Sequence, residues 1–302
     1  MSVSPDHTAI NLYCSESASG VVSSNTRTSC QCISRTAFGS PVDEESAIEH
    51  MFDSENDQMQ RHEFFRGVLN SDEIVTARCN AIDWMLKVHA YHNLRYETAY
   101  LSVNYLDCFL RSRPMLEGQQ WQWQLLSVAC LSLAAKMEET KVPLLLELQI
   151  MEPEFVFKPK TVQRMELLVM ASLTWRLRIV TPFDFVDYFT RKAQCASDAQ
   201  VHQLCCISAV VSDLIIRTCR VIDFQGHKPS AIAAAAVLCT IGRSSRDPNI
   251  FILHERVSKD AVKRCQLLFE EILRIKCNKI YSTQKYLPWT PSQIETELPT
   301  KQ

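Results

Sequence analysis

The stretch Trp121–Glu139, WQWQLLSVACLSLAAKMEE, decides the fold of this chain. It contains neither Gly nor Pro and is rich in residues that favour helices. Between Leu125 and Ala135, apolar side chains would lie on nearly every side of such a helix, so neighbouring elements must cover it on several sides. Charged residues follow without a loop, namely Lys136, Glu138 and Glu139. We therefore expect the central helix of a bundle, whose last turn brings charge to a surface.

The composition favours helical domains of ordinary size. The 302 residues suffice for two domains, and 46% of them are hydrophobic. Only six residues are Gly, which argues against β-sandwiches, barrels and folds that cradle phosphate. The net charge of −2 differs from the basic balance typical of nucleic-acid binding. We therefore expect no nucleic acid among the main partners.

Cysteine usage and hydropathy indicate the cellular compartment of the protein. The thirteen cysteines include no Cys-x-x-Cys pair, and several fall within apolar helical runs, as Cys130, Cys239 and Cys265 do. Such residues are expected to be small buried thiols, which indicates a reducing compartment and predicts neither a cofactor nor a metal. No secretory leader is evident, and no apolar run approaches the ~20 residues of a membrane span. We expect a location in nucleus and cytoplasm and no membrane partner.

Periodicity along the chain predicts an all-α protein of two tandem five-helix bundles. Residues 1–44 are expected to be disordered, 45–178 to form the first bundle with a leading helix, 179–280 the second bundle, and 281–302 a tail. Ala234 follows Ala134 by 100 residues, each in an Ala-rich central helix, which is typical of a structural repeat. The expected helices are 45–68 with an acidic interruption at 53–57, then 74–91, 97–111, 121–139, 144–150 and 160–175, and in the second bundle 182–193, 198–220, 229–243, a short turn at 248–254, and 258–276.

A short segment near the N-terminus alternates at period two. In Leu12-Tyr13-Cys14-Ser15-Glu16, an extended backbone would turn Leu12 and Cys14 toward one partner surface, with Glu16 near a basic or N–H group. The alternative is a chance match within a Ser-rich region.

Several long segments resemble the cyclin box, and they look most like plant D-type cyclins. They occur in the order of that family and cover roughly residues 70–276. The segments are Ala81–Val88 (AIDWMLKV), Ala99–Leu110 (AYLSVNYLDCFL), Leu125–Glu139, Val142–Leu145 (VPLL), Arg164–Val169 (RMELLV), Val180–Phe185 (VTPFDF), and Ile222–Phe224 (IDF) beside Pro229–Ser230.

The resemblance implies a regulatory subunit with two five-helix bundles and no catalysis of its own. A cyclin binds a cyclin-dependent Ser/Thr kinase and presses on the kinase's regulatory helix, which aligns the phosphate-binding Lys–Glu ion pair and helps order the activation loop. D-type cyclins also carry an N-terminal LxCxE motif that binds retinoblastoma-type pocket proteins. Leu12, Cys14 and Glu16 fit that motif, so the resemblance implies promotion of progression from G1 into S phase.

Two charges in the first bundle are implied to contact the kinase. By the family's pattern they are Lys136 and Glu166, and Leu133, Met137 and Met170 lie within a turn of them. A carboxylate within an apolar stripe is costly unless it is paired. The alternative is an internal Lys136–Glu166 pair that joins two helices, with the three apolar residues as ordinary core. Both interpretations can hold together.

Other family positions carry further expectations. Arg78 and Asp107 are interpreted as a buried ion pair that ties the first helix of the bundle to the second. Trp84 and Gln124 match a patch that docks substrates or kinase inhibitors carrying an Arg-x-Leu motif. The patch departs from the family at its bulky apolar positions, which are Ala77, Asn80 and Ala81 here, and Lys87 stands where an acid is usual. Lys87 would repel the Arg of that motif.

Thr290-Pro291 is a candidate phosphorylation site in the tail, and a plain turn is the alternative. Two other classes of function remain open, a cyclin-fold transcription factor and a scaffold without kinase activation. An enzyme is not expected, because the chain contains no GxSxG, HExxH, P-loop or dinucleotide fingerprint.

Overall fold

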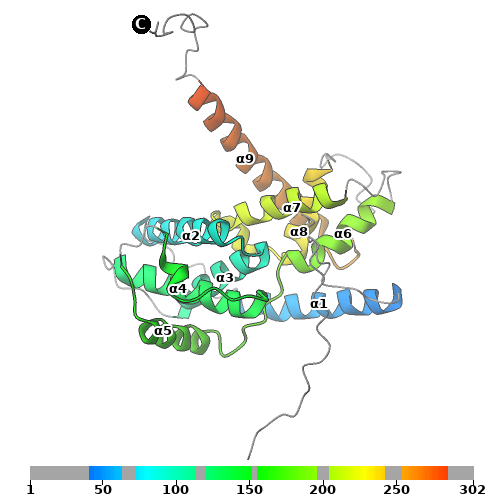
Figure 1. Ribbon diagram of the computed structural model, residues 1–302. Coiled ribbons are helices and arrows are strands. Elements are labelled where there is room, and N and C mark those ends of the chain that lie inside the picture. The colour runs from blue at the N-terminus through cyan, green and yellow to red at the C-terminus, as the bar shows by residue number, and fades with distance from the viewer. Residues whose placement is uncertain are drawn as a thin grey trace, which may run out of the picture. The chain divides into compact units, whose positions relative to one another are not determined.

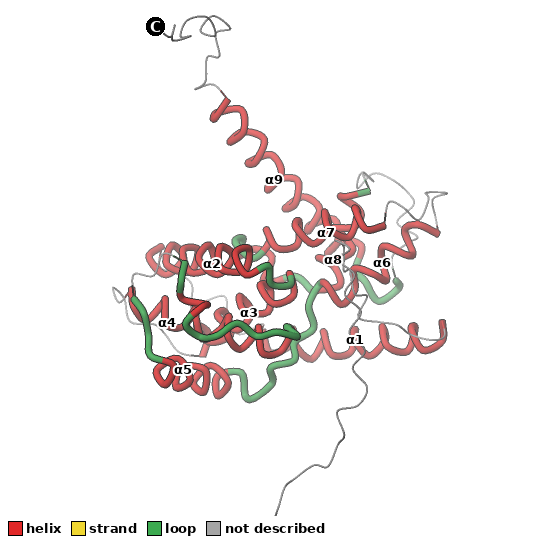
Figure 2. The backbone as a smooth tube through the Cα atoms, in the orientation of Figure 1, coloured by secondary structure: helices red, strands yellow, loops and turns green. Residues whose placement is uncertain are grey.

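The structure, a computed structural model, describes residues 41–62, 72–112, 120–151, 155–195, 204–241 and 254–284. These residues fall within one unit of the chain, Ser34–Gln302, and form helices and loops without a β-strand among them (Figures 1 and 2). The helices are α1 (Pro41–His62), α2 (Asp72–His92), α3 (Tyr96–Ser112), α4 (Gln120–Glu138), α5 (Pro159–Ser172), α6 (Phe183–Cys195), α7 (Leu204–Thr218), α8 (Pro229–Thr240) and α9 (Lys259–Gln284), with 3-10 turns at Glu147–Gln149 and Ile222–Gly226.

Each bundle is built around one helix that is buried on all sides. Every side chain of α4 from Leu125 to Ala135 is buried, and α2, α3 and α5 pack around it. Every residue of α8 from Pro229 to Leu238 is buried in the same way, beneath α6, α7 and α9. An all-apolar helix cannot face water, so each draws a shell of amphipathic helices. The expected all-α fold with two tandem bundles is confirmed.

Three expected elements differ in extent from the structure. The helix expected at 144–150 is reduced to the 3-10 turn Glu147–Gln149, because side chains take over the backbone groups: the Glu147 carboxylate accepts from the amide of Leu144, and the Gln149 amide bonds both backbone groups of Phe157. Helix α9 continues to Gln284, beyond the expected end at 276 and into the expected tail. The turn expected at 248–254 lies outside the described residues except for His254.

The leading helix departs most from expectation. Helix α1 begins at Pro41, inside the segment expected to be disordered, and runs without the interruption expected at 53–57. Chain order groups it with the first bundle, whereas its Ile48 and Phe52 are buried in the core of the second. Its acidic residues do not break the helix because two of them, Asp53 and Glu55, bind groups on the second bundle.

Glu55 caps the central helix of the second bundle from outside that bundle. Its carboxylate accepts hydrogen bonds from the amide and the hydroxyl of Ser230, each at 2.8 Å, at the N-terminus of α8. A carboxylate in this position satisfies a free amide and faces the positive end of the helix dipole. Burial raises the pKa of Glu55, and the bonds from Ser230 and the charges of Lys228 and Arg256 offset part of that rise.

This raised pKa predicts how stability varies with pH. A folded state whose Glu55 pKa lies above the ordinary value of 4.5 binds the proton more tightly than the unfolded chain does. That contribution is fully present below pH 4.5 and is lost as pH rises through the folded pKa. The free energy of unfolding of the wild type, relative to a Glu55→Gln variant, should therefore fall as pH rises above 4.5. Urea titrations at several pH values measure it, and a constant difference would contradict the assignment.

Among the described cysteines, Cys130, Cys219 and Cys265 are buried thiols, whereas Cys79, Cys108 and Cys239 are half-buried, so the burial expected of Cys239 is only partial. Burial raises the pKa of Cys219 and Cys265 to about 12 and that of Cys130 well above its ordinary value. These groups therefore stay protonated at neutral pH and act as small apolar side chains. Within the described part of the chain, no helix is long and apolar enough to span a membrane.

Candidate functional site

Lys136 and Glu166 meet where α4 packs against α5. The carboxylate oxygen Oε1 of Glu166 accepts hydrogen bonds from Lys136 Nζ and from Ser132 Oγ, both at 2.6 Å. Glu166 is only 5% exposed, whereas the Lys136 side chain is 44% exposed. No described residue donates to the second oxygen of Glu166, which keeps acceptor capacity for a group that arrives from outside. The geometry therefore accommodates both an internal pair and an outward contact.

The apolar residues expected beside this pair are not equally accessible. Met137 is 42% exposed and Met170 is half-buried, so both can contact a partner. Leu133 is buried in the hydrophobic core of the first bundle, where it packs on the inner side of α4. We call the set formed by the exposed Lys136 and Met137, the half-buried Met170 and the buried carboxylate of Glu166 the rim face.

A hollow of about 660 Å³ adjoins the rim face. Met137 and Glu138 line one side, and the segment that joins the two bundles, Leu177–Val180, lines another. Helix α1 supplies a further wall through His50, Met51 and Ser54. Sequence reasoning missed this wall, because only the docking of α1 brings those residues to the end of α4. Nothing in the local pattern of α1 signals it.

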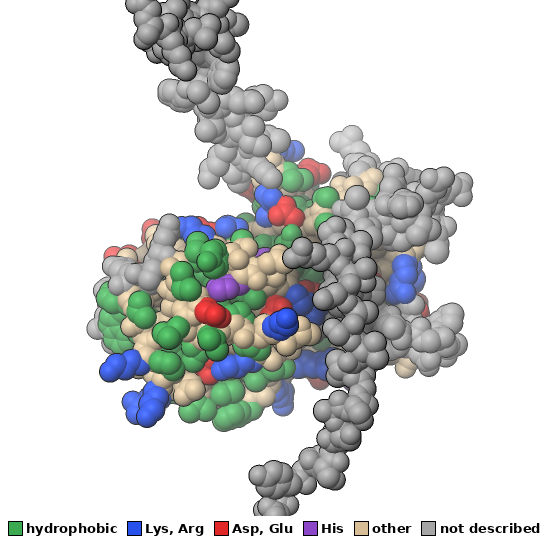
Figure 3. Space-filling model, in the orientation of Figure 1, with side chains coloured by type: hydrophobic (Ala, Val, Ile, Leu, Met, Phe, Trp, Pro, Cys, Tyr) green, Lys and Arg blue, Asp and Glu red, His purple; other side chains and the backbone are tan. Residues whose placement is uncertain are grey.

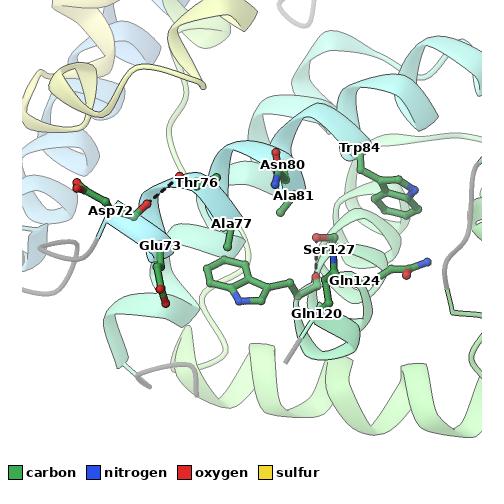
Figure 4. A pocket seen from close by; sticks show the side chains of 11 residues that line it. Asp72, Glu73, Thr76, Ala77, Asn80, Ala81, Trp84, Gln120, Gln124 and Ser127 are labelled. Carbon is green, nitrogen blue, oxygen red and sulfur yellow. Dashed lines mark hydrogen bonds between the residues drawn. The ribbon is translucent and has the colours of Figure 1, made fainter. Parts of the chain in front are cut away.

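Trp84 and Gln124 line a second cavity, of about 550 Å³, between α2 and α4. In Figure 4, Asp72 and Glu73 lie at one end of it, Trp84 and Gln124 lie toward the other, and Ala77 lies between them. Lys87 is not among the lining residues, which include two acids and no base. The expected repulsion of a basic residue by Lys87 therefore does not arise inside the cavity.

The polar ends of these two side chains already hold the connector between α4 and α5. The indole N–H of Trp84 donates to the carbonyl of Met151 at 2.9 Å. The amide of Gln124 donates to the carbonyl of Phe155 and accepts from its N–H. Both residues thus have a structural role, and an occupant of the cavity would meet their apolar parts.

Arg78 and Asp107 form a buried node that joins the two bundles. Arg78 Nε and Nη2 donate to the two oxygens of Asp107 at 2.7 and 2.9 Å, which ties α2 to α3. Nη2 also donates to the carbonyl of Cys219, and the amide of Gln225 donates to Asp107, so groups that follow α7 complete the node. The sequence predicts the pair alone, because nothing in the first bundle indicates the partners more than 100 residues away.

One group of side chains has the composition of a cation site. Glu45, Glu49 and His254 place ligand atoms within 4.8 Å of one another. Arg256 already occupies this group: its guanidinium pairs with Glu49, and its amide donates to Nδ1 of His254. That bond leaves the proton of a neutral imidazole on Nε2, which faces the carboxylates and would have to leave before a metal could bind. The cluster is better described as a clasp that holds α1 to the second bundle.

The remaining predicted site residues lie outside the described part of the chain. They are Leu12, Cys14 and Glu16 of the N-terminal motif and Thr290 of the tail.

Family comparisons agree with the two-bundle arrangement. The model of the cyclin N-terminal domain matches residues 46–178, and that of the cyclin C-terminal domain matches residues 180–288. The chain belongs to the cyclin family. The first of these matches includes most of α1, although the core that α1 fills is that of the second bundle.

Within the family, similar curated proteins include plant D-type cyclins. Cyclin-D4-1 of Oryza sativa subsp. japonica is 39% identical over 78% of this cyclin and 64% of its own length. Cyclin-D2-2 of the same species is 37% identical over 84% of this chain and 71% of the relative's length. Cyclin-D1-1 of Arabidopsis thaliana is 41% identical over 65% of this chain and 58% of the relative's length. The cyclin described here spans about six tenths of the length of the first relatives it matches.

The fold also matches solved structures. A viral cyclin from herpesvirus saimiri superposes with a TM-score of 0.58 at 17% identity, over 73% of this chain and 97% of that one. The expected resemblance to plant D-type cyclins is thus confirmed at the level of family and fold.

Proposed function

We propose that this cyclin binds and activates a cyclin-dependent Ser/Thr kinase through the rim face. The observation that carries the proposal is the Lys136–Glu166 pair, in which a buried carboxylate with a free oxygen lies next to an exposed ammonium, beside a hollow of mixed polar and apolar lining. Such a pair presents one donor and one acceptor in fixed positions. The Glu166 carboxylate is held in a fixed position, because it accepts a hydrogen bond from Ser132, which lies in the buried part of α4.

The geometry fits a contact with the regulatory helix of the kinase. Lys136 would donate to a backbone carbonyl of that helix, and the free oxygen of Glu166 would accept a backbone N–H. Met137, Met170 and the neighbouring hollow would receive an apolar side chain from the same helix. A preformed face of this kind shifts the kinase toward the conformation in which its phosphate-binding Lys–Glu pair is aligned.

A second part of the proposal concerns retinoblastoma-type pocket proteins. The segment Leu12-Tyr13-Cys14-Ser15-Glu16 supports it, because Leu12, Cys14 and Glu16 match LxCxE in the region where D-type cyclins carry the motif. A tethered pocket protein would reach a high effective concentration at the kinase, which favours its phosphorylation over that of free substrates. The cyclin would thereby promote progression from G1 into S phase, and it would act in nucleus and cytoplasm.

The cavity at Trp84 and Gln124 supports a further docking role. Its two acids, Asp72 and Glu73, complement the basic residue of an Arg-x-Leu segment in a substrate or a kinase inhibitor. Ala77 and Ala81 leave space for the apolar residue. Phosphorylation of Thr290 stays a prediction for the tail.

Reconstitution tests the proposed function. The purified cyclin alone should transfer no phosphate from ATP, whereas its addition to a purified kinase should raise phosphorylation of a generic peptide. Cys14→Gly with Glu16→Lys should abolish preferential phosphorylation of a pocket protein and leave peptide phosphorylation unchanged. Binding without activation would favour the scaffold alternative, and DNA binding without kinase binding the transcription-factor alternative.

A further inference from the structure

A small cavity lies where the two bundles meet. It has a volume of about 60 Å³, and residues of both bundles line it. Its polar lining includes Arg78 and Arg111 from the first bundle and Gln225 and His227 from the second. It shares no lining residue with the cavity between α2 and α4, and only Val180 with the hollow beside the rim face. We call it the junction cavity.

Arg78 brings an unsatisfied donor to the junction cavity. Its Nε and Nη2 donate to Asp107 and to the carbonyl of Cys219, whereas Nη1 has no acceptor among the described residues. The side chain is only 1% exposed, so bulk water does not compensate. A buried N–H group without an acceptor costs free energy, and native proteins rarely keep one without a reason. An acceptor held in the cavity would supply that reason.

The other polar groups of the lining are mainly donors. The primary amide of Gln225 uses one N–H for Asp107 and has a second to donate. The side-chain amide of Asn104 makes no hydrogen bond to a described residue. Arg111 adds a further guanidinium, whose Nη2 donates to the weakly accepting sulfur of Cys108. A ligand of the junction cavity should therefore be an acceptor.

The charge of the lining has the same preference. Among the described residues that line the cavity, Arg78 and Arg111 are basic, Asp107 is the one acid, and His227 adds positive charge when it is protonated. The oxygens of Asp107 already accept hydrogen bonds from Arg78 and Gln225. The lining is thus net positive, although the whole chain has a net charge of −2. On the surface that Figure 3 shows, in contrast, acidic and basic side chains are interspersed.

We propose that the junction cavity binds a small oxyanion of the size of inorganic phosphate. A tetrahedral oxyanion has acceptor oxygens in several directions, which suits donors that come from α2, from α3 and from the segment after α7. The volume is about twice the share of one water molecule in the liquid, so it admits such an ion but not the rest of a phosphorylated peptide. The bound ion would join the two bundles. This inference does not depend on the proposed function.

Thermal denaturation of the purified cyclin tests the site. Replacement of chloride by phosphate at constant ionic strength should raise the midpoint temperature saturably, by about 3–6 °C at a phosphate concentration tenfold above the dissociation constant. Phosphate also stabilises proteins in general, because it is excluded from their surfaces. That general effect does not saturate at low concentration and does not depend on a single cavity. Isothermal titration calorimetry should show one phosphate bound per chain.

Two variants with matched controls locate the ion. Asn104→Asp keeps the shape of the side chain, adds negative charge to the lining, and should abolish the saturable rise. Asn80→Asp is its control, because Asn80 is exposed on α2 and lines the other cavity. Arg111→Gln should weaken phosphate binding about tenfold or more. Arg264→Gln, which changes an exposed base of α9, should leave it unchanged. Circular dichroism should show the same helix content for all four variants.

The opposite results would overturn the inference. A rise of equal size in the wild type and in Asn104→Asp would assign the effect to phosphate in bulk solution. Equal stabilisation by chloride would assign it to ionic strength alone. A phosphoserine peptide distinguishes the free ion from a phosphoryl group on a larger molecule. It should leave the midpoint temperature unchanged, and a rise with the peptide but not with phosphate would show that the proposed ligand is wrong.

Discussion

Asp107→Ala should lower the free energy of unfolding by about 3–5 kcal/mol. The substitution leaves the Arg78 guanidinium, which is 1% exposed, buried without its counter-ion. Burial alone would lower the pKa of Arg78, but the charge and hydrogen bonds of Asp107 outweigh burial and raise it, so the carboxylate offsets the cost of burying the guanidinium charge. Since folded domains are typically stable by about 5–15 kcal/mol, the variant should be only marginally folded.

Two further variants show whether burial is the cause. Arg78→Met with Asp107→Leu removes both charges and should recover part of the lost stability, because no unpaired ion is left inside. Asp83→Ala breaks the exposed pair between Asp83 and Arg220, which also links α2 to the segment after α7, and it should cost less than about 1 kcal/mol. Urea denaturation followed by circular dichroism measures all three. Equal losses for Asp83→Ala and Asp107→Ala would refute the argument.

The second large effect is expected on kinase binding. Lys136→Ala with Glu166→Ala should weaken affinity for the kinase by about 2–5 kcal/mol, or roughly thirtyfold to several thousandfold, because partner groups that bond to the pair would be buried without partners. Kinase activation in the reconstituted assay should fall with it. Lys141→Ala is the matched control, since Lys141 is an exposed lysine just past the same helix end.

The single variants have a distinct signature. Lys136→Ala leaves the buried Glu166 carboxylate with Ser132 as its only described partner, so it should be less stable than the double variant. Isothermal calorimetry gives the affinities, and thermal denaturation gives the order of stabilities. Unchanged affinity in the double variant would show that the rim face does not contact the kinase, and the proposed mechanism would then be wrong.

How well the sequence predicts the structure differs from element to element. The two central helices, α4 and α8, were predictable because an Ala-rich, nearly all-apolar run has one stable solution, burial on every side. Helix α1 was predicted, but with a break at 53–57, because its acids look unfavourable when only neighbouring residues are considered. In the fold they face Ser230 and Arg256. The connector after α4 was mistaken for a helix, because the bonds from Gln149 to Phe157 are not visible in local propensity.

In the candidate site, too, some features follow from the sequence and others only from the tertiary structure. The residue types at 136 and 166 and their link to the cyclin family come from the sequence, and so does the Leu12–Glu16 motif. The wall that α1 adds to the hollow appears only when the helices are placed.

The sequence by itself determined which segments are helical, which two of them lie at the centre, and which family the chain resembles, because these depend on side chains within a few turns of one another. The tertiary structure alone decided that α1 belongs to the second core and that Arg78 joins both bundles. It also decided which charges remain free at the surface. These outcomes rest on contacts such as Glu55 with Ser230, 175 residues apart, and no local periodicity encodes a pairing over that distance.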